Sequence, residues 1–289
     1  TVNRRRVKSG DPVTMPLRLE SVTLAGAALT VTAPLPAELV YVADSLSYPY
    51  GVGGYDAATR TVQWQGMIPS AQLRESEINY TWGDSEGRGD NLAATYVWEV
   101  IGAGGLNLPG GDDLYTCGLP IGFDFSFYGE KQRQFCVSTN GFLSFDPSGG
   151  SSLINQCPLP NPIAINNVIA AVWDDLVVEG MAYETMGQAP NRRLVFTWRG
   201  ARRFGIVTGR LAEFQVILYE RGPIKMQYRD VGTLNGADST TGLENQTGTV
   251  GVTYACNQPR SLTDELAILY TLNIGGRAAT EIHFQATPA

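Results

Sequence analysis

Side chains suited to acid–base or nucleophilic chemistry are scarce in this 289-residue chain. His283 is the only histidine, and it alternates with the apolar residues Ile282 and Phe284. Catalytic sites of the Ser–His–Asp or Cys–His type need a histidine as the base. A histidine in such an alternating run is more typical of a strand position that faces solvent or a partner. The sequence therefore predicts a protein that is not an enzyme.

Two adjacent carboxylates, Asp174 and Asp175, are the next candidates for chemistry. Neighbouring residues of a strand point to opposite faces, so they form no catalytic pair unless the strand bends. A calcium site needs about six oxygens, and Asp112, Asp113 and Asp146 are the acidic residues that would supply more of them. The alternative is that these side chains cap turns. We expect no cofactor, with structural calcium at Asp174 and Asp175 as the weaker hypothesis.

Four cysteines are spread over the second part of the chain, and none has the short spacing of a metal site. An even number of dispersed cysteines favours two disulfides and an oxidising compartment, against four free thiols. Cys117 precedes a Phe-rich strand and Cys136 lies on the next one. Cys157 lies in a loop and Cys256 ends a later strand. Of the three possible connectivities, we favour Cys117–Cys136 with Cys157–Cys256.

Two Asn-X-Thr sequons suggest that the protein is glycosylated. They lie at Asn79 and Asn245, and Glu77 precedes the first by two residues. Such sequons mark acceptor sites on the surface of secreted proteins, although they also arise by chance. We take Asn79 as the first candidate for a covalent glycan and Asn245 as the second.

Composition and charge exclude two classes of protein. The net charge is −7 and only 17% of residues are charged, whereas nucleic-acid binders carry a basic face. No stretch of about 18 apolar residues is present, so no membrane insertion is expected. The first residue is Thr1, as after removal of a signal peptide. Residues 1–10 carry four positive charges and no negative one, so the remainder carries −11.

Short alternating runs and 33 glycines predict an all-β chain of two β-sandwich domains. We expect a basic arm at 1–10, a first domain at 11–95 and a second at 96–289. The polar, Gly-rich segment 83–91 is the best linker candidate, and its Arg88-Gly89-Asp90 triplet is interpreted as generic loop rather than an integrin motif. Asn140-Gly141 predicts a hairpin turn.

Each domain resembles a family of extracellular modules. The first resembles the Ig-like conserved repeat domain of bacterial surface proteins, although Ala33 and Glu38 stand where Asp and Gly are usual. The second resembles nidogen-like extracellular domains. Both resemblances imply structural or adhesive modules with no shared catalytic centre. The matching segments are 9–14, 33–39 and 54–64 for the first domain, and 119–129, 137–145, 169–176, 214–219 and 242–248 for the second.

These features predict a secreted, non-catalytic structural protein displayed at the cell surface. We expect its partners to be other copies of itself and glycans, and not nucleic acid. The arm is expected to add a strand to the open edge of a neighbouring copy, as in a filament or layer. The alternative is a glycan- or matrix-binding adhesion module cut from a larger secreted protein. The expected arm residues are Val2, Arg4, Arg5, Arg6 and Val7.

Overall fold

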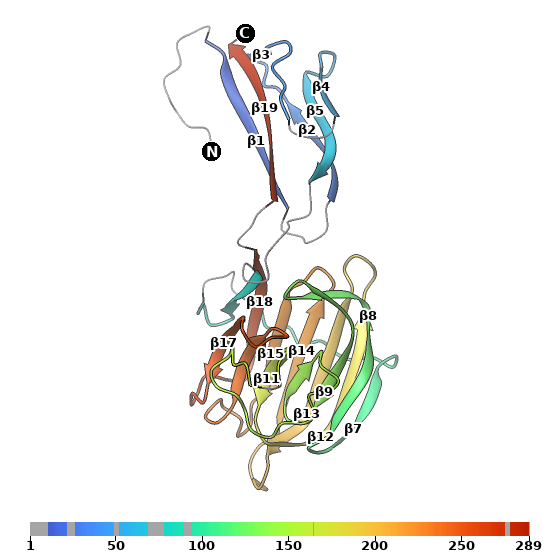
Figure 1. Cartoon of the computed structure of the whole chain (residues 1–289), viewed down its shortest axis with the longest axis vertical. Coiled ribbons are helices and arrows are strands. Elements are labelled where there is room, and N and C mark those ends of the chain that lie inside the picture. Colours follow the sequence, from blue (N-terminus) through green and yellow to red (C-terminus); the bar gives the residue numbers. More distant parts are fainter. Residues whose placement is uncertain are drawn as a thin grey trace. The chain divides into compact units, whose positions relative to one another are not determined.

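The computed structural model describes residues 11–21, 27–48, 52–68, 78–89, 94–163, 165–274 and 278–288. Within these ranges every regular element is a β-strand (Figure 1), which confirms the all-β prediction. The same ranges contain no helix that is long and apolar enough to cross a membrane. The chain divides into two compact units, the first built from 1–74 with 274–289 and the second from 75–273.

Unit 1 consists of two three-stranded sheets, with strand orders β1-β19-β3 and β2-β5-β4. Leu35 and Val62 pack against Phe284 and Ala286 to form its core. The strands are β1 (Val13–Ser21), β2 (Ala27–Pro34), β3 (Leu39–Tyr41), β4 (Val52–Asp56), β5 (Thr61–Ile68) and β19 (Ala278–Pro288).

The position of β19 corrects the expected boundary between the domains. We placed residues 96–289 together, but β19 pairs with β1 from Val13↔Ala286 to Ser21↔Ala278 and also pairs with β3. Figure 1 shows it between these two strands. Its alternating apolar residues give it one buried face. That pattern reveals a half-buried strand without saying which sheet it joins.

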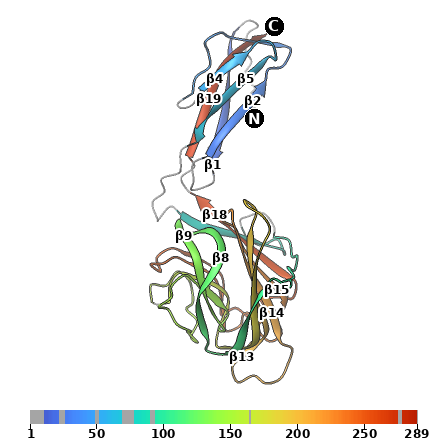
Figure 2. The same ribbon diagram turned by 90° about the vertical axis from the view of Figure 1, so that its right-hand side faces the viewer.

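Unit 2 contains two larger sheets, which Figure 2 shows as separate layers with β8 and β9 in one and β13 to β15 in the other. The first has the order β17 (Gly251–Cys256), β16 (Thr240–Glu244), β11 (Val168–Trp173), β10 (Phe142–Ser144), β9 (Glu130–Ser138), β8 (Tyr115–Phe127). The second has the order β6 (Ile78–Asp84), β18 (Leu266–Ile274), β15 (Ile224–Asp230), β14 (Ala212–Tyr219), β13 (Arg193–Arg203), β12 (Leu176–Met186), β7 (Leu106–Asp112).

Aromatic side chains join the two layers of unit 2. The Phe135 ring of β9 lies edge-on to the ring of Phe196 on β13, with the centroids 5.8 Å apart. The indole of Trp198 donates to the Ser138 carbonyl at 2.9 Å, and the Tyr228 hydroxyl donates to a carbonyl of β11 at 2.9 Å. The polar groups of these two buried aromatics are thus satisfied across the core, which helps to fix how the layers stack.

Strand β6 is a second correction to the domain boundary. Its residues were expected to close the first domain, with 83–91 as a linker after them. Instead β6 is the edge strand of the seven-stranded sheet, next to β18. The described part of 83–91 belongs to unit 2. Gly-rich polar sequence indicates a turn but does not distinguish a tight turn within a domain from a linker between domains.

Candidate functional site

The two adjacent aspartates, Asp174 and Asp175, form the bend between β11 and β12. Asp174 is buried and pairs with Arg203, whose Nη2 lies 2.8 Å from Oδ2. Burial raises the pKa of Asp174, and the arginine opposes that rise. Asp174 is therefore part of an ion pair within the fold, and it does not join the other carboxylates considered for calcium.

Asp175 instead joins two other carboxylates. Its side chain lies with those of Asp112, at the end of β7, and Asp113, with ligand oxygens all within 4.8 Å of one another. We call Asp112, Asp113 and Asp175 the acidic cluster. Asp112 and Asp113 therefore lie close to Asp175, while calcium binding there stays a prediction. Asp146 is engaged elsewhere, because its carboxylate accepts hydrogen bonds from Ser148.

Asn140 orients this cluster. Its side-chain nitrogen donates to Asp113 Oδ1 at 2.7 Å, and its Oδ1 accepts the backbone N–H of Leu176 at 2.8 Å. Asn140 and Gly141 also form the predicted turn between β9 and β10, where Gly141 has φ +78°. The turn motif was recognisable in the sequence, whereas the role of its side chain toward the cluster had no sequence signal.

The acidic cluster brings three negative charges together. Burial, together with the nearby Asp113 and Asp112, raises the pKa of Asp175, and the charge of Arg203 opposes that rise. No lysine or arginine of the part of the chain described here forms an ion pair with the cluster. Three carboxylates in this geometry attract a cation, which can be a metal ion or the side chain of another protein.

The predicted disulfides are the two present in the structure. Cys117 bonds to Cys136 and Cys157 bonds to Cys256, with sequence separations of 19 and 99. The first joins neighbouring strands β8 and β9. The second fixes the long loop between β10 and β11 to the end of β17, so it holds a segment without regular structure against the sheet.

The two sequons differ in their surroundings. Asn79 is exposed on β6 and remains a prediction as a glycan acceptor. Asn245 is 1% exposed, and its amide nitrogen donates to Thr247 Oγ1 at 2.9 Å while its oxygen accepts two backbone N–H groups. A glycan has no room there in the folded protein, which argues against Asn245 as an acceptor. A sequon records residue types and not exposure.

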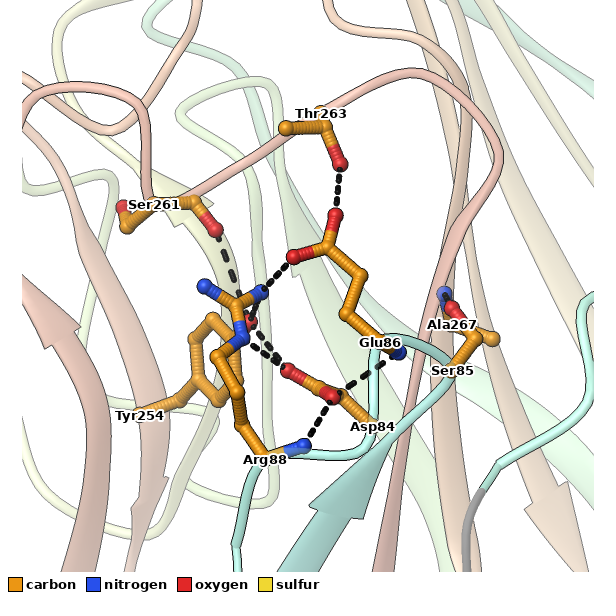
Figure 3. A network of polar contacts seen from close by, with 8 residues as sticks. All are labelled: Asp84, Ser85, Glu86, Arg88, Tyr254, Ser261, Thr263 and Ala267. Atoms are coloured by element: carbon orange, nitrogen blue, oxygen red, sulfur yellow. Dashed lines mark hydrogen bonds and ion pairs between the residues drawn. The ribbon is translucent and has the colours of Figure 1, made fainter.

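A hydrogen-bond network holds the turn that follows β6 (Figure 3). Asp84 is completely buried, and its carboxylate accepts bonds from the side chain of Arg88 at 2.6 Å and from the Tyr254 hydroxyl at 2.9 Å. Burial raises the pKa of Asp84, but these bonds outweigh burial and leave the pKa below its ordinary value. Glu86 completes the network by pairing with Arg88 and accepting a bond from Thr263.

This network engages the guanidinium of Arg88, although the residue stays exposed. Its guanidinium contacts Asp84, Glu86 and Tyr254 at once, which supports the interpretation of the Arg-Gly-Asp triplet as ordinary loop. The expected arm residues Val2 to Val7 lie outside the described residues. His283 lies on β19, where its backbone pairs with Ser47.

Disulfide-bonded β-sandwich modules are the class that this fold and these contacts define. The model of the family described as NIDO related matches residues 90–282, well over half of the chain. The chain therefore belongs to the NIDO-related family, which is non-enzymatic. This confirms the nidogen-like prediction for the second domain, and both the family and the disulfides are consistent with an extracellular protein. No curated protein and no solved structure matches the chain.

Proposed function

We propose that this is a secreted, non-catalytic structural protein that assembles from copies of itself into a filament or layer at the cell surface. The observation that carries the proposal is the acidic cluster, whose carboxylates form no ion pair with a lysine or arginine of the described residues. The same sequence carries the complementary group, because Arg4, Arg5 and Arg6 follow one another in a segment without acidic residues. Opposite charges on two parts of one chain favour head-to-tail contact between copies.

The acidic cluster lies where two edge strands meet. β7 ends at Asp112 and β8 begins at Tyr115, and each is the last described strand of its sheet. β7 carries Pro109, which removes one backbone donor, a common protection of an edge strand. In the proposal, the arm of the next copy pairs with the exposed edge of β8 while its arginines contact the cluster.

The first test is deletion of residues 1–10, followed by electron microscopy of untreated material. We expect the full chain to form regular polymers and the deleted chain to stay monomeric. Polymers of unchanged appearance after the deletion would refute the proposal. An equal melting temperature for the two proteins would show that the deletion leaves both units folded.

A charge exchange tests the specific contact. Replacing Arg4, Arg5 and Arg6 by Glu is expected to abolish assembly, and so is replacing Asp112 and Asp175 by Lys. Combining both sets restores opposite charges between neighbouring copies, so assembly should return. Failure of the combined variant to assemble, while it remains folded, would exclude this pairing. Calcium is the competing occupant, and assembly that needs calcium and ignores the arm would favour the metal.

Adhesion to glycans or matrix is the second candidate function. Aromatic residues in Gly-rich loops can stack on sugars, but Tyr55 and Tyr48 are used within unit 1, because Tyr55 stacks on Tyr41 with centroids 4.4 Å apart and the Tyr48 hydroxyl accepts the N–H of Gly53. A cavity in unit 2 favours adhesion instead. Saturable glycan binding by a protein that stays monomeric would support this candidate over assembly.

A further inference from the structure

Residues 94–101 cross the outer face of the seven-stranded sheet, and we call them the strap. They are held by two buried glutamines that point away from the core, Gln215 on β14 and Gln227 on β15. Gln215 donates to the Glu99 carbonyl at 2.7 Å and accepts the Glu99 N–H at 3.3 Å, and Gln227 accepts the Val97 N–H at 3.3 Å. These bonds satisfy amides that would be costly to bury unpaired, so the strap is a fixed part of the fold.

A cavity of about 610 Å³ lies beside the strap. Its volume is in the range of small-molecule sites. Apolar walls come from Pro190, Pro223 and Leu269, and hydrogen-bonding groups come from Thr95 and Asn191. The remaining lining includes Ala94, Tyr219 and six charged side chains, namely Glu99, Arg192, Arg193, Glu220, Arg221 and Lys225.

The charged side chains that line this cavity leave a net positive charge. Arg193 binds Glu99 with two bonds of 2.9 and 2.8 Å, and Arg192 binds Glu220 with bonds of 3.0 and 2.6 Å. Both acids are therefore neutralised by a two-point arginine contact. Lys225 and the exposed Arg221 remain as surplus positive charge.

Lys225 differs from the other charged residues of the cavity in being buried without a partner among the described residues. Its residue is 8% exposed, and its ammonium forms no hydrogen bond and no ion pair with any residue in the described ranges. Burial lowers the pKa of Lys225, and Glu99 partly opposes this. A buried ammonium without a partner destabilises a fold. An anionic ligand in the cavity would supply the missing partner.

We propose that this cavity binds an acidic sugar, with the ligand carboxylate paired to Lys225 and Arg221. The apolar walls suit the faces of a sugar ring, and the amide of Asn191 and hydroxyl of Thr95 suit its hydroxyl groups. The walls of the cavity are held by bonds within the protein, so little ordering accompanies binding. This inference does not depend on self-assembly, and a monomer would bind equally well.

Calorimetric titration of the full chain with glucuronic acid tests the proposal, with glucose and glutamate as comparisons. We expect saturable binding of glucuronic acid, with glucose and glutamate each at least tenfold weaker. The weak binding of glucose would show the need for the carboxylate, and that of glutamate the need for the ring. Absence of saturable glucuronic acid binding would overturn the proposal, and stronger binding of glutamate would replace it with an acidic peptide.

Substitutions then locate the site. Lys225→Met should weaken glucuronic acid binding at least tenfold, and Arg221→Met, at an exposed position, should weaken it severalfold. Lys131→Met is the matched control, because Lys131 is exposed and pairs with Asp124 outside the cavity. Equal affinity in the Lys225 and Lys131 variants would overturn the assignment. If the Lys225 variant fails to fold, unchanged affinity in the Arg221 variant would overturn it by itself.

Discussion

Glu244 on β16 makes the stability of unit 2 depend on pH. Its side chain is fully buried. The backbone N–H of Asn161 donates to one carboxylate oxygen, and the amide nitrogen of Asn166, when oriented toward the glutamate, lies 2.9 Å from the other. No described lysine or arginine forms an ion pair with it. Burial raises its pKa from 4.5 to about 7, against the opposing bond from Asn161.

Because the pKa of Glu244 is raised in the folded state, unit 2 loses stability as the pH rises. Below pH 4.5 Glu244 is protonated in the folded and unfolded chain alike, so its stabilising contribution is fully present. As the pH rises from 4.5 through about 7, the unfolded chain loses its proton first, and the folded state loses stability. The full effect is about 3 kcal/mol, and about 2 to 3 kcal/mol of it falls between pH 5 and pH 8. That is a large share of the ~5–15 kcal/mol typical of a folded protein.

Urea denaturation of the wild type and Glu244→Gln at pH 5 and pH 8 measures this contribution. Asp174 and Asp175 also have raised pKa values, so the comparison between variants isolates Glu244. We expect the stability of the variant relative to the wild type to increase by about 2 to 3 kcal/mol from pH 5 to pH 8. Glu130→Gln, at an exposed position, is the control and should show no such change. Identical pH dependence in wild type and Glu244→Gln would refute the reasoning.

Three further predictions concern the fold. Gly141→Ala should lower the free energy of unfolding by at least about 3 kcal/mol in a denaturation experiment, because an added Cβ would lie 2.0 Å from the Val172 carbonyl oxygen. Gly150→Ala is the control: its φ is similar but the space around it is open, so it should cost about 1 kcal/mol. Replacing both cysteines of the Cys157–Cys256 pair by Ser should destabilise unit 2 by about 4 to 5 kcal/mol, more than the loss of the 19-residue bridge. Deleting 278–288 should leave unit 2 resistant to protease while unit 1 becomes sensitive, because β19 is the middle strand of its sheet. Equal losses of unfolding free energy in the two glycine variants would contradict the first prediction. A larger loss on removing the Cys117–Cys136 disulfide would contradict the second, and a protease-resistant unit 1 would contradict the third.

The sequence predicted features that depend on local pattern. The turn at Gly141, the strands around it and the disulfide partners follow from alternation, turn residues and spacing. The partners of β19 and β6 could not be predicted in this way, since a half-buried strand has the same period in either unit. The burial of Asn245 could not be predicted either, because a sequon specifies three residue types and not their exposure in the fold.

Uncompensated charge is what the sequence cannot show and the structure can. Asp84 and Asp174 are acidic, buried and paired with an arginine of the same unit, so each already has a cationic partner within the fold. Lys225 is buried without such a partner, and Asp175 is half-buried with two carboxylates beside it and no ion pair to an arginine or lysine of the described residues. The acidic cluster lies beside edge strands, where another protein chain can pair with the backbone, whereas Lys225 lines a cavity of about 610 Å³, a volume in the range of small-ligand sites. This difference in surroundings is why we propose assembly for the first site and sugar binding for the second.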